Sequence, residues 1–291
     1  MNGIPIALRT RNRPAYLDVT LKSIQATRLG DSPLLVIDDC SDDAVSRSYI
    51  QTNELLRLSE PVNWPGVPEW GLYVGRLVSV ARLRGIAGKV EVVQPETRKG
   101  VRGGVFWCID YLFTRFPDQQ EVILVEADAV FHHDWLSVTC KAYEECRDKP
   151  GPNGNKLGLL SCYDRKGNEL NRTGWRWRSV KKKDDGTWGC NDGIGGVMYL
   201  VTRDFYNAAK ATMKATHNPN ARGGDTMLQG LCGTHGFNIA VTVPSMCQHI
   251  GVSSTAWPEK GWRYTRNFRR PFAFETFVDG RAVSEDWYNE P

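Results

Sequence analysis

Two short apolar runs, each followed by acidic residues, constrain the fold of this chain more than any other feature. Leu34–Ile37 and Val122–Val125 are hydrophobic at every position. Such runs are typical of parallel strands that are buried on both faces of a sheet. The first is followed by Asp38 and Asp39, and the second by the Glu-Ala-Asp segment at 126–128. Because open α/β sheets present ligand-binding side chains at the carboxyl ends of their strands, these acids predict a site at that edge.

The spacing of hydrophobic residues predicts further strands and helices around these runs. Residues 4–8 alternate as in a strand, and residues 10–14 (Thr-Arg-Asn-Arg-Pro) form a turn. The apolar positions in 17–24 recur at helical spacing, and the proline at 14 suits the first turn of that helix. A second amphipathic helix is expected at 105–116. The Pro-, Gly- and Asn-rich segment 149–156 then interrupts the pattern.

Strands are expected beyond that interruption at 158–162, 196–202 and 237–243. Alternating strands and helices, followed by more mixed elements, predict an α/β fold. We expect a single domain with a Rossmann-like, mixed and mostly parallel sheet flanked by helices.

Composition and charge exclude several classes of protein. The chain has 291 residues, 41% hydrophobic and 24% charged, which is ordinary for a globular protein, and its net charge of +4 does not by itself imply a polyanionic partner. The eight cysteines form no C-x-x-C pair of the kind that zinc sites use. No apolar run is long enough to span a membrane, so we expect a cytoplasmic protein without membrane insertion.

The motifs, taken in order, resemble the inverting glycosyltransferases of the GT-A fold, with features like those of galactosyltransferases. The matching segments are residues 10–14, 36–43, 126–128, 195–197, 203–205, 223–228 and 248–251. The resemblance implies a nucleotide-sugar-binding half at 1–130, an acceptor-binding and catalytic half at 131–256, and a C-terminal basic and aromatic segment at 257–291. It implies that Asp128 and His249 bind Mn²⁺ or Mg²⁺, which favour oxygen ligands and accept an imidazole.

The other site residues fall into three roles. Asp225 is the expected general base, which would deprotonate the acceptor hydroxyl. The expected contacts to the donor, a nucleotide-sugar such as a UDP-sugar, are Thr10, Arg11, Arg13, Asp39, Arg98, Glu126, Gly195 and Gly196. The expected contacts to the acceptor or the diphosphate are Trp177, Lys181, Lys182, Lys183, Trp257, Trp262, Arg263 and Arg266.

Ala127 departs from the family pattern, because many relatives carry an acid there and alanine cannot bind a ribose or a metal-bound water. Glu126 is the residue that could take over this contact. Simpler interpretations also stand beside the functional ones: Asp39 could belong to a turn, and Asp225 could cap a helix that begins at Thr226. The remaining histidines, among them His132 and His133, are expected to be structural.

The acceptor is the least constrained part of the prediction. Residues 172–183 and 257–270 combine basic and aromatic side chains, which suit a phosphate backbone with an exposed base. Some bacteriophage enzymes glycosylate hydroxymethylated bases in DNA, and such an enzyme would act in the cytoplasm of the host cell. The alternative acceptor is a glycan or a glycolipid precursor, in which case 257–270 would close over the diphosphate. The alternative from another functional class is a nucleic-acid-binding module without catalytic activity.

Overall fold

The structure is a computed structural model. It describes residues 3–25, 27, 29–42, 91–163, 174–178, 180–184, 186, 188–190, 194–215, 223–243, 245–249, 276–278 and 281–283.

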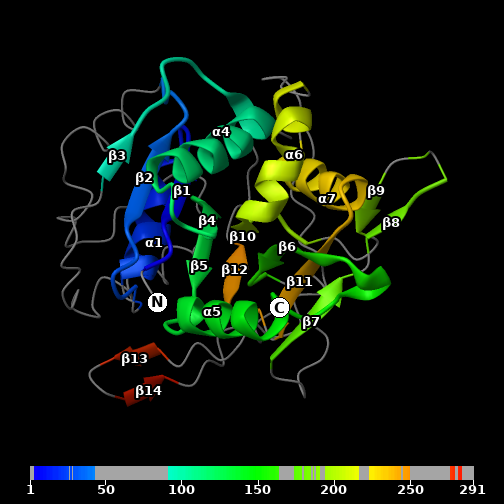
Figure 1. Cartoon of the computed structure of the whole chain (residues 1–291). Coiled ribbons are helices and arrows are strands. Elements are labelled where there is room, and N and C mark those ends of the chain that lie inside the picture. The colour runs from blue at the N-terminus through cyan, green and yellow to red at the C-terminus, as the bar shows by residue number, and fades with distance from the viewer. Residues whose placement is uncertain are drawn as a thin grey trace.

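An eight-stranded sheet lies at the centre of the molecule, with the strand order β3-β2-β1-β4-β10-β6-β11-β7 (Figure 1). Its strands are β1 (Ile6–Thr10), β2 (Leu34–Asp38), β3 (Glu91–Val93), β4 (Glu121–Glu126), β6 (Lys156–Ser161), β7 (Gly174–Arg178), β10 (Met198–Thr202) and β11 (Phe237–Val243). Four of the seven pairings between neighbouring strands are parallel, and the other three are antiparallel. The order 3-2-1-4 in the first half is that of a doubly wound nucleotide-binding sheet.

Helices cover both faces of this sheet. The apolar sides of α1 (Pro14–Gln25) and α5 (Trp135–Cys146) join one hydrophobic cluster. Those of α4 (Gly100–Arg115), α6 (Arg203–Ala215) and α7 (Gly224–Thr234) join a second cluster, and Figure 1 shows these three helices together on one side.

Alternating residues of each central strand feed the two clusters. In β4, Ile123 and Val125 point into the first cluster, whereas Val122 and Leu124 point into the second. Burial on both faces explains why this strand is apolar at four consecutive positions. The expected fold class, α/β with a mixed, mostly parallel sheet flanked by helices, is confirmed.

Three short two-stranded sheets complete the described elements. They are β5 (Ala129–Phe131) with β12 (Cys247–His249), β8 (Val180–Lys182) with β9 (Trp188–Cys190), and β13 (Thr276–Val278) with β14 (Arg281–Val283). The 3-10 turn η2 (Pro152–Gly154) lies in the segment expected to interrupt the pattern. None of the described helices is long and apolar enough to cross a membrane. The division at residues 130 and 256 stays a prediction.

The expected element boundaries shift by a few residues. The strand expected at 237–243 is found there, and the one expected at 158–162 begins two residues earlier. The helix expected from 105 begins at Gly100. The prediction started too late because the first turn contains glycines, which do not show the apolar spacing of a helix. A Cβ at Gly104 would lie 2.7 Å from Nη1 of Arg9, so a larger residue there would require the Arg9 side chain to shift.

Candidate active site

The parallel register of three neighbouring strands brings their acidic ends to one edge of the sheet. Thr10 of β1 lies opposite Asp38 of β2, and Arg9 lies opposite Glu126 of β4. The loops that follow these strands therefore start side by side. This is the edge that the sequence predicted as a site.

Asp128 and His249 meet at this edge through the small sheet of β5 and β12. The antiparallel register places His249 opposite Ala129, next to Asp128. Nε2 of His249 lies 3.3 Å from Oδ2 of Asp128, and the two side chains are only 12% and 10% exposed. The structure thus brings together the two residues predicted to bind a metal.

Arg13 contacts the same oxygen of Asp128. Its Nη1 donates a hydrogen bond to Oδ2 of Asp128, and its side chain is 18% exposed. Burial alone would raise the pKa of the Asp128 carboxyl, but its interactions with His249 and Arg13 outweigh this effect and lower that pKa below its ordinary value. Asp128 is therefore a carboxylate at neutral pH.

Arg9 and Glu126 form a second, separate ion pair across β1 and β4. Nε and Nη2 of Arg9 donate to Oε1 of Glu126 at 3.1 and 2.5 Å. Nη1 of Arg9 donates to the carbonyl oxygen of Val101 at 2.9 Å, which ties the pair to the first turn of α4. Burial raises the pKa of Glu126, while Arg9 acts in the opposite direction. The other carboxylate oxygen, Oε2, is not part of these contacts.

The two aspartates after β2 have different surroundings. Both oxygens of Asp39 accept backbone N–H groups at the start of α4, from Lys99 at 2.6 Å and from Gly100 at 2.9 Å. Asp38 accepts bonds from Ser41 N–H at 3.1 Å and from Gln94 Nε2 at 3.0 Å, and burial raises its pKa. Asp39 thus stabilises the start of α4, as a carboxylate does at the positive end of a helix. Its contact with a donor stays a prediction.

Asn12 and Asp42 join the loops that follow β1 and β2. The Asn12 side chain donates to Oδ1 of Asp42 and accepts the Asp42 backbone N–H at 2.9 Å. Asn12 has a positive φ of 50°, a conformation that asparagine tolerates better than most residues. Arg11 adds an ion pair of 2.8 Å to the same aspartate. These contacts hold the loop that carries Arg13 in place.

Asp225 lies in the first turn of α7, next to the segment that leads into β10. A Cβ placed on Gly196 would lie 3.4 Å from the Cβ of Asp225. The carbonyl oxygen of Val197 accepts the backbone N–H of Glu126 at 2.9 Å, so this segment also touches the strand end that carries the acids. The distance of 3.4 Å is ordinary van der Waals contact, so Gly196 and Asp225 lie side by side near that edge.

One expectation about the start of α7 needs correction. The helix begins at Gly224 after the N-cap Gly223, which makes no side-chain cap bond, so Asp225 lies inside the helix and does not cap it. A Cβ on Gly224 would lie 2.7 Å from Cγ2 of Val105. This glycine therefore allows α4 and α7 to pack closely. Gly223 has φ 76°, a left-handed conformation that favours glycine.

The remaining predicted contacts are scattered. Thr10, Gly195 and Gly196 lie near the strand ends, and Arg98 is exposed just before α4. Trp177 on β7 is partly buried, packs against the first hydrophobic cluster and contacts Trp175 edge to face. Its contact with an acceptor stays a prediction. Trp257, Trp262, Arg263, Arg266 and the segment 257–270 lie outside the described residues.

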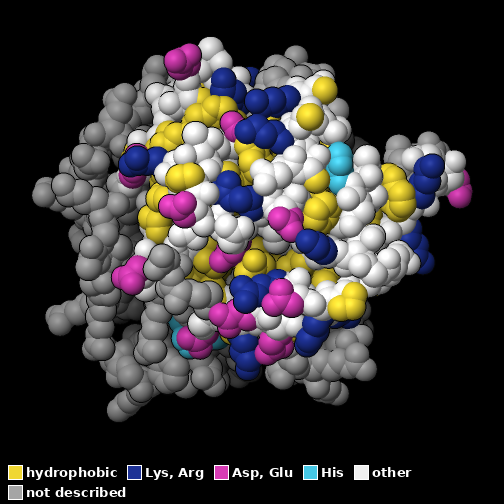
Figure 2. All heavy atoms as spheres, viewed as in Figure 1, with side chains coloured by type: hydrophobic (Ala, Val, Ile, Leu, Met, Phe, Trp, Pro, Cys, Tyr) yellow, Lys and Arg dark blue, Asp and Glu magenta, His cyan; other side chains and the backbone are white. Residues whose placement is uncertain are grey.

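Lys181, Lys182 and Lys183 are exposed on the hairpin of β8 and β9 and the turn that follows β8. The hairpin packs on α7, where Gly233 makes room for the ring of Trp188. It projects from the molecule in Figure 1, and Figure 2, in the same view, shows basic and acidic side chains together at its tip.

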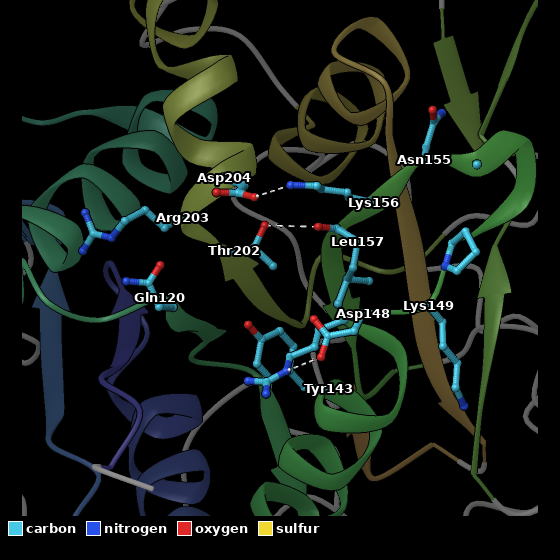
Figure 3. A pocket seen from close by; sticks show the side chains of 13 residues that line it. Gln120, Tyr143, Asp148, Lys149, Asn155, Lys156, Leu157, Thr202, Arg203 and Asp204 are labelled. Carbon is cyan, nitrogen blue, oxygen red and sulfur yellow. Dashed lines mark hydrogen bonds and ion pairs between the residues drawn. The ribbon is translucent and has the colours of Figure 1, made fainter.

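A hollow of about 510 Å³ lies at the opposite edge of the sheet, where β4 and β6 begin and β10 ends (Figure 3). Charged side chains that line it are paired: Lys156 Nζ lies 3.2 Å from Oδ2 of Asp204, and Arg147 Nε lies 3.2 Å from Oδ2 of Asp148. None of the residues predicted to form the site lines this hollow. We therefore place the chemistry at the strand-end cluster, where charged side chains of distant segments converge.

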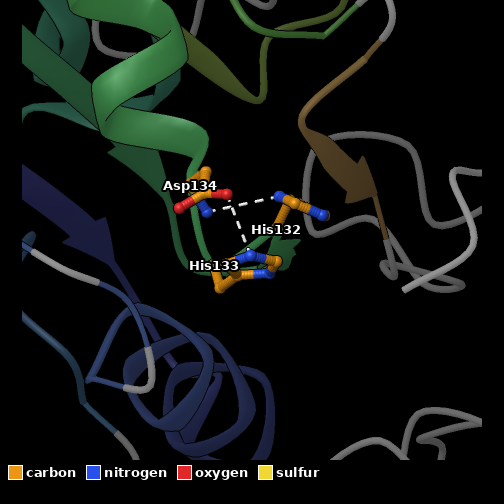
Figure 4. A group of neighbouring side chains, drawn as sticks. All are labelled: His132, His133 and Asp134. Carbon is orange, nitrogen blue, oxygen red and sulfur yellow. Dashed lines mark hydrogen bonds and ion pairs between the residues drawn. The ribbon is translucent and has the colours of Figure 1, made fainter. Parts of the chain in front are cut away.

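His132, His133 and Asp134 form another group that could hold a metal ion (Figure 4). His133 Nε2 lies 2.9 Å from Oδ2 of Asp134, whose backbone N–H donates to Nδ1 of His132 at 3.2 Å. Asp134 is the N-cap residue of α5 and makes no side-chain cap bond. His133 and Asp134 are 44% and 45% exposed. The Asp128–His249 pair is far more buried and is the better candidate.

Sequence reasoning missed Arg9. This residue lies on a buried strand and neutralises Glu126, yet only Thr10, Arg11 and Arg13 were singled out from its segment. A charged residue inside an otherwise apolar strand was the available signal, because a charge is buried only when it is paired.

Comparisons with known proteins give matches of structure alone. No family model and no curated protein matches the sequence. The mannosyltransferase PcManGT from Pyrobaculum calidifontis, solved in complex with GDP-Man and Mn²⁺, is 14% identical with a TM-score of 0.43, covering 82% of this chain and 56% of that one. Residues 1–349 of S. aureus TarS are 12% identical with a TM-score of 0.46, covering 83% and 58%.

The same TarS fragment in complex with UDP-GlcNAc is 13% identical with a TM-score of 0.42, covering 83% of this chain and 56% of that one. This chain therefore spans little more than half the length of these structures.

Proposed function

We propose that this chain is a metal-dependent glycosyltransferase that moves a sugar from a nucleotide-sugar, such as a UDP-sugar, to an acceptor hydroxyl with inversion. The observation that supports this most is the buried pair of Asp128 and His249 at the carboxyl edge of the sheet. A buried carboxylate beside an imidazole offers two of the ligands that a divalent cation such as Mn²⁺ can take.

The distance between the two side chains fits a metal site. Two neighbouring ligands that each lie about 2.1–2.2 Å from an ion are about 3 Å apart, and Oδ2 of Asp128 lies 3.3 Å from Nε2 of His249. Bound there, Mn²⁺ or Mg²⁺ would neutralise the charge that develops on the departing diphosphate. We propose Asp128 and His249 as the residues that hold it.

Asp225 is the proposed base. Asp225 lies beside Gly196. The neighbouring residue Val197 accepts a backbone hydrogen bond from Glu126 through its carbonyl oxygen. From that position its carboxylate would accept the proton of the acceptor hydroxyl, while the sugar faces the strand ends. The donor contacts proposed from the sequence flank this cluster: Thr10, Arg11, Arg13, Asp39, Arg98, Glu126, Gly195 and Gly196.

The acceptor proposal is a hydroxymethylated base in double-stranded DNA, as in a bacteriophage DNA-modifying enzyme. Its support is the trio of exposed lysines, 181–183, on the projecting hairpin, where phosphate contacts would be accessible. A base must leave the stack to reach a buried site. A glycan acceptor is the alternative, and it would not require these lysines.

The test is a screen of nucleotide-sugars for hydrolysis, with Mn²⁺ and with EDTA. We expect hydrolysis of at least one UDP-sugar with Mn²⁺ and none with EDTA, together with thermal stabilisation by UDP plus Mn²⁺. Stabilisation by DNA without any response to nucleotides would favour the binding-module alternative.

A further inference from the structure

Arg13 contacts the Asp128 oxygen that the proposed metal ion would bind. Its guanidinium and the imidazole of His249 both contact Oδ2 of Asp128. These side chains are mostly buried, so their charges interact through little water. A divalent cation at this oxygen would face the permanent positive charge of Arg13 at close range. The ion and the guanidinium therefore compete for one carboxylate.

The position of Arg13 at the start of α1 would allow its side chain to bind a second anionic group besides Asp128. Its carbonyl oxygen accepts the Leu17 N–H at 2.9 Å, which makes Arg13 the residue from which α1 starts. Its guanidinium also lies 5.6 Å from the centre of the Tyr16 ring. The start of a helix carries a partial positive charge that favours phosphate, and a guanidinium binds phosphate through two parallel hydrogen bonds. An arginine displaced from Asp128 would remain at the start of α1, where a phosphate group is favoured.

We propose that Arg13 is a displaceable counter-ion: it pairs with Asp128 in the metal-free protein, yields Asp128 to the metal ion, and then binds the diphosphate of the nucleotide-sugar. This inference rests on the proposed function. It makes metal and nucleotide binding mutually supportive, because the nucleotide gives the displaced guanidinium an anionic partner. Linkage then requires each ligand to tighten the other.

The test measures binding rather than turnover. Mn²⁺ is titrated calorimetrically into the full chain, wild type and Arg13→Gln, without nucleotide and with saturating UDP. Without UDP, we expect Arg13→Gln to bind Mn²⁺ on the order of tenfold more tightly, because its competitor is gone. We expect its affinity for UDP in the presence of Mn²⁺ to fall by a similar factor. The two changes have opposite signs, which a merely structural role would not produce.

Two further variants complete the experiment. Arg13→Lys keeps the competing charge but not the two-pronged donor, so it should bind Mn²⁺ as the wild type does and UDP more weakly. Arg147→Gln removes an exposed arginine at the opposite edge of the sheet and should change neither affinity. Circular dichroism and thermal melting establish that each variant is folded.

The outcomes separate this inference from the proposed function. Weaker or unchanged Mn²⁺ binding by Arg13→Gln, with normal wild-type binding of Mn²⁺ and UDP, overturns the role of Arg13 alone. If Arg13→Gln does not fold, Arg13→Lys decides: unchanged UDP affinity in that variant overturns the inference. Failure of the wild type to bind Mn²⁺ or UDP overturns both proposals.

Discussion

Oδ2 of Asp128 lies 3.3 Å from Nε2 of His249, although the two residues belong to distant parts of the chain. The pairing of β5 with β12 creates this contact, since His249 stands opposite Ala129 in the register. The pair lies at the edge of the sheet where β1, β2 and β4 end, and it supports the metal site on which the proposed function depends.

Asp128→Asn should abolish metal-dependent transfer while the protein still folds. The substitution keeps the shape of the side chain and removes the charge that Arg13 and His249 contact. We expect a loss of about 1–3 kcal/mol in the free energy of unfolding, because hydrogen bonds to a charged group are lost. Transfer assays and urea denaturation measure the two effects. Undiminished turnover by this variant in EDTA would exclude the metal hypothesis.

His249→Ala should raise the Mn²⁺ concentration required for activity, since one ligand of the proposed site is removed. His133→Ala is the matched control, because it removes a histidine from the exposed group at the start of α5. A metal requirement that shifts in His133→Ala and not in His249→Ala would assign the metal to the exposed group instead.

The contribution of Asp128 to stability should depend on pH in the acid range. The pKa of this carboxyl is lower in the folded protein than in the unfolded chain, where it is about 3.9. The unfolded chain therefore binds more protons as the pH falls below about 4, and the stabilisation, fully present above that pH, is progressively lost. The difference in unfolding free energy between wild type and Asp128→Asn should shrink below about pH 4. A difference that stays constant down to pH 2 would contradict this expectation.

Asp225→Asn should lose transfer while it keeps donor and metal binding. General-base assistance contributes about a hundred- to ten-thousand-fold in rate, and the amide cannot accept the proton. The maximal rate and the donor affinity are measured separately over a range of donor concentrations. A loss confined to donor affinity would make Asp225 a binding residue.

The buried pair of Arg9 and Glu126 should show strong coupling in a double-mutant cycle. Glu126→Leu leaves the Arg9 charge without its partner and should cost about 3–5 kcal/mol in unfolding free energy. The double variant Arg9→Met/Glu126→Leu should recover most of this loss, because no unpaired charge remains. Urea unfolding of the wild type and the three variants gives the coupling energy. Additive losses would mean that the two side chains contribute independently.

Neutralising Lys181, Lys182 and Lys183 together tests the DNA proposal. If each lysine contacts a phosphate, the slope of DNA affinity against salt concentration should fall by up to about three units. Hydrolysis of the nucleotide-sugar should not change, since these exposed lysines are not among the proposed donor or metal contacts. Weak duplex binding that is insensitive to these substitutions and to hydroxymethylated bases would leave a glycan as the acceptor.

The sequence by itself determined the buried strands and the acids at their ends. Four consecutive apolar residues before Glu126 are typical of a strand that is buried on both faces. This pattern can be recognised without knowing which distant residues cover the strand. Helical spacing likewise predicted most of α4. The packing at the start of α7 could not be predicted from local sequence. A side chain at Gly224 would clash with a methyl group of Val105, which belongs to another helix.

Only the tertiary structure decided which charges neutralise one another. Asp39 bonds the amides at the start of α4, Arg9 pairs with Glu126, and Arg13 shares Asp128 with His249. These contacts join segments that are far apart along the chain, and the strand order and register place them within reach. Local spacing can show that a residue is charged and buried. Because the burial of a charge is favourable only beside its partner, the identity of that partner is a property of the assembled sheet.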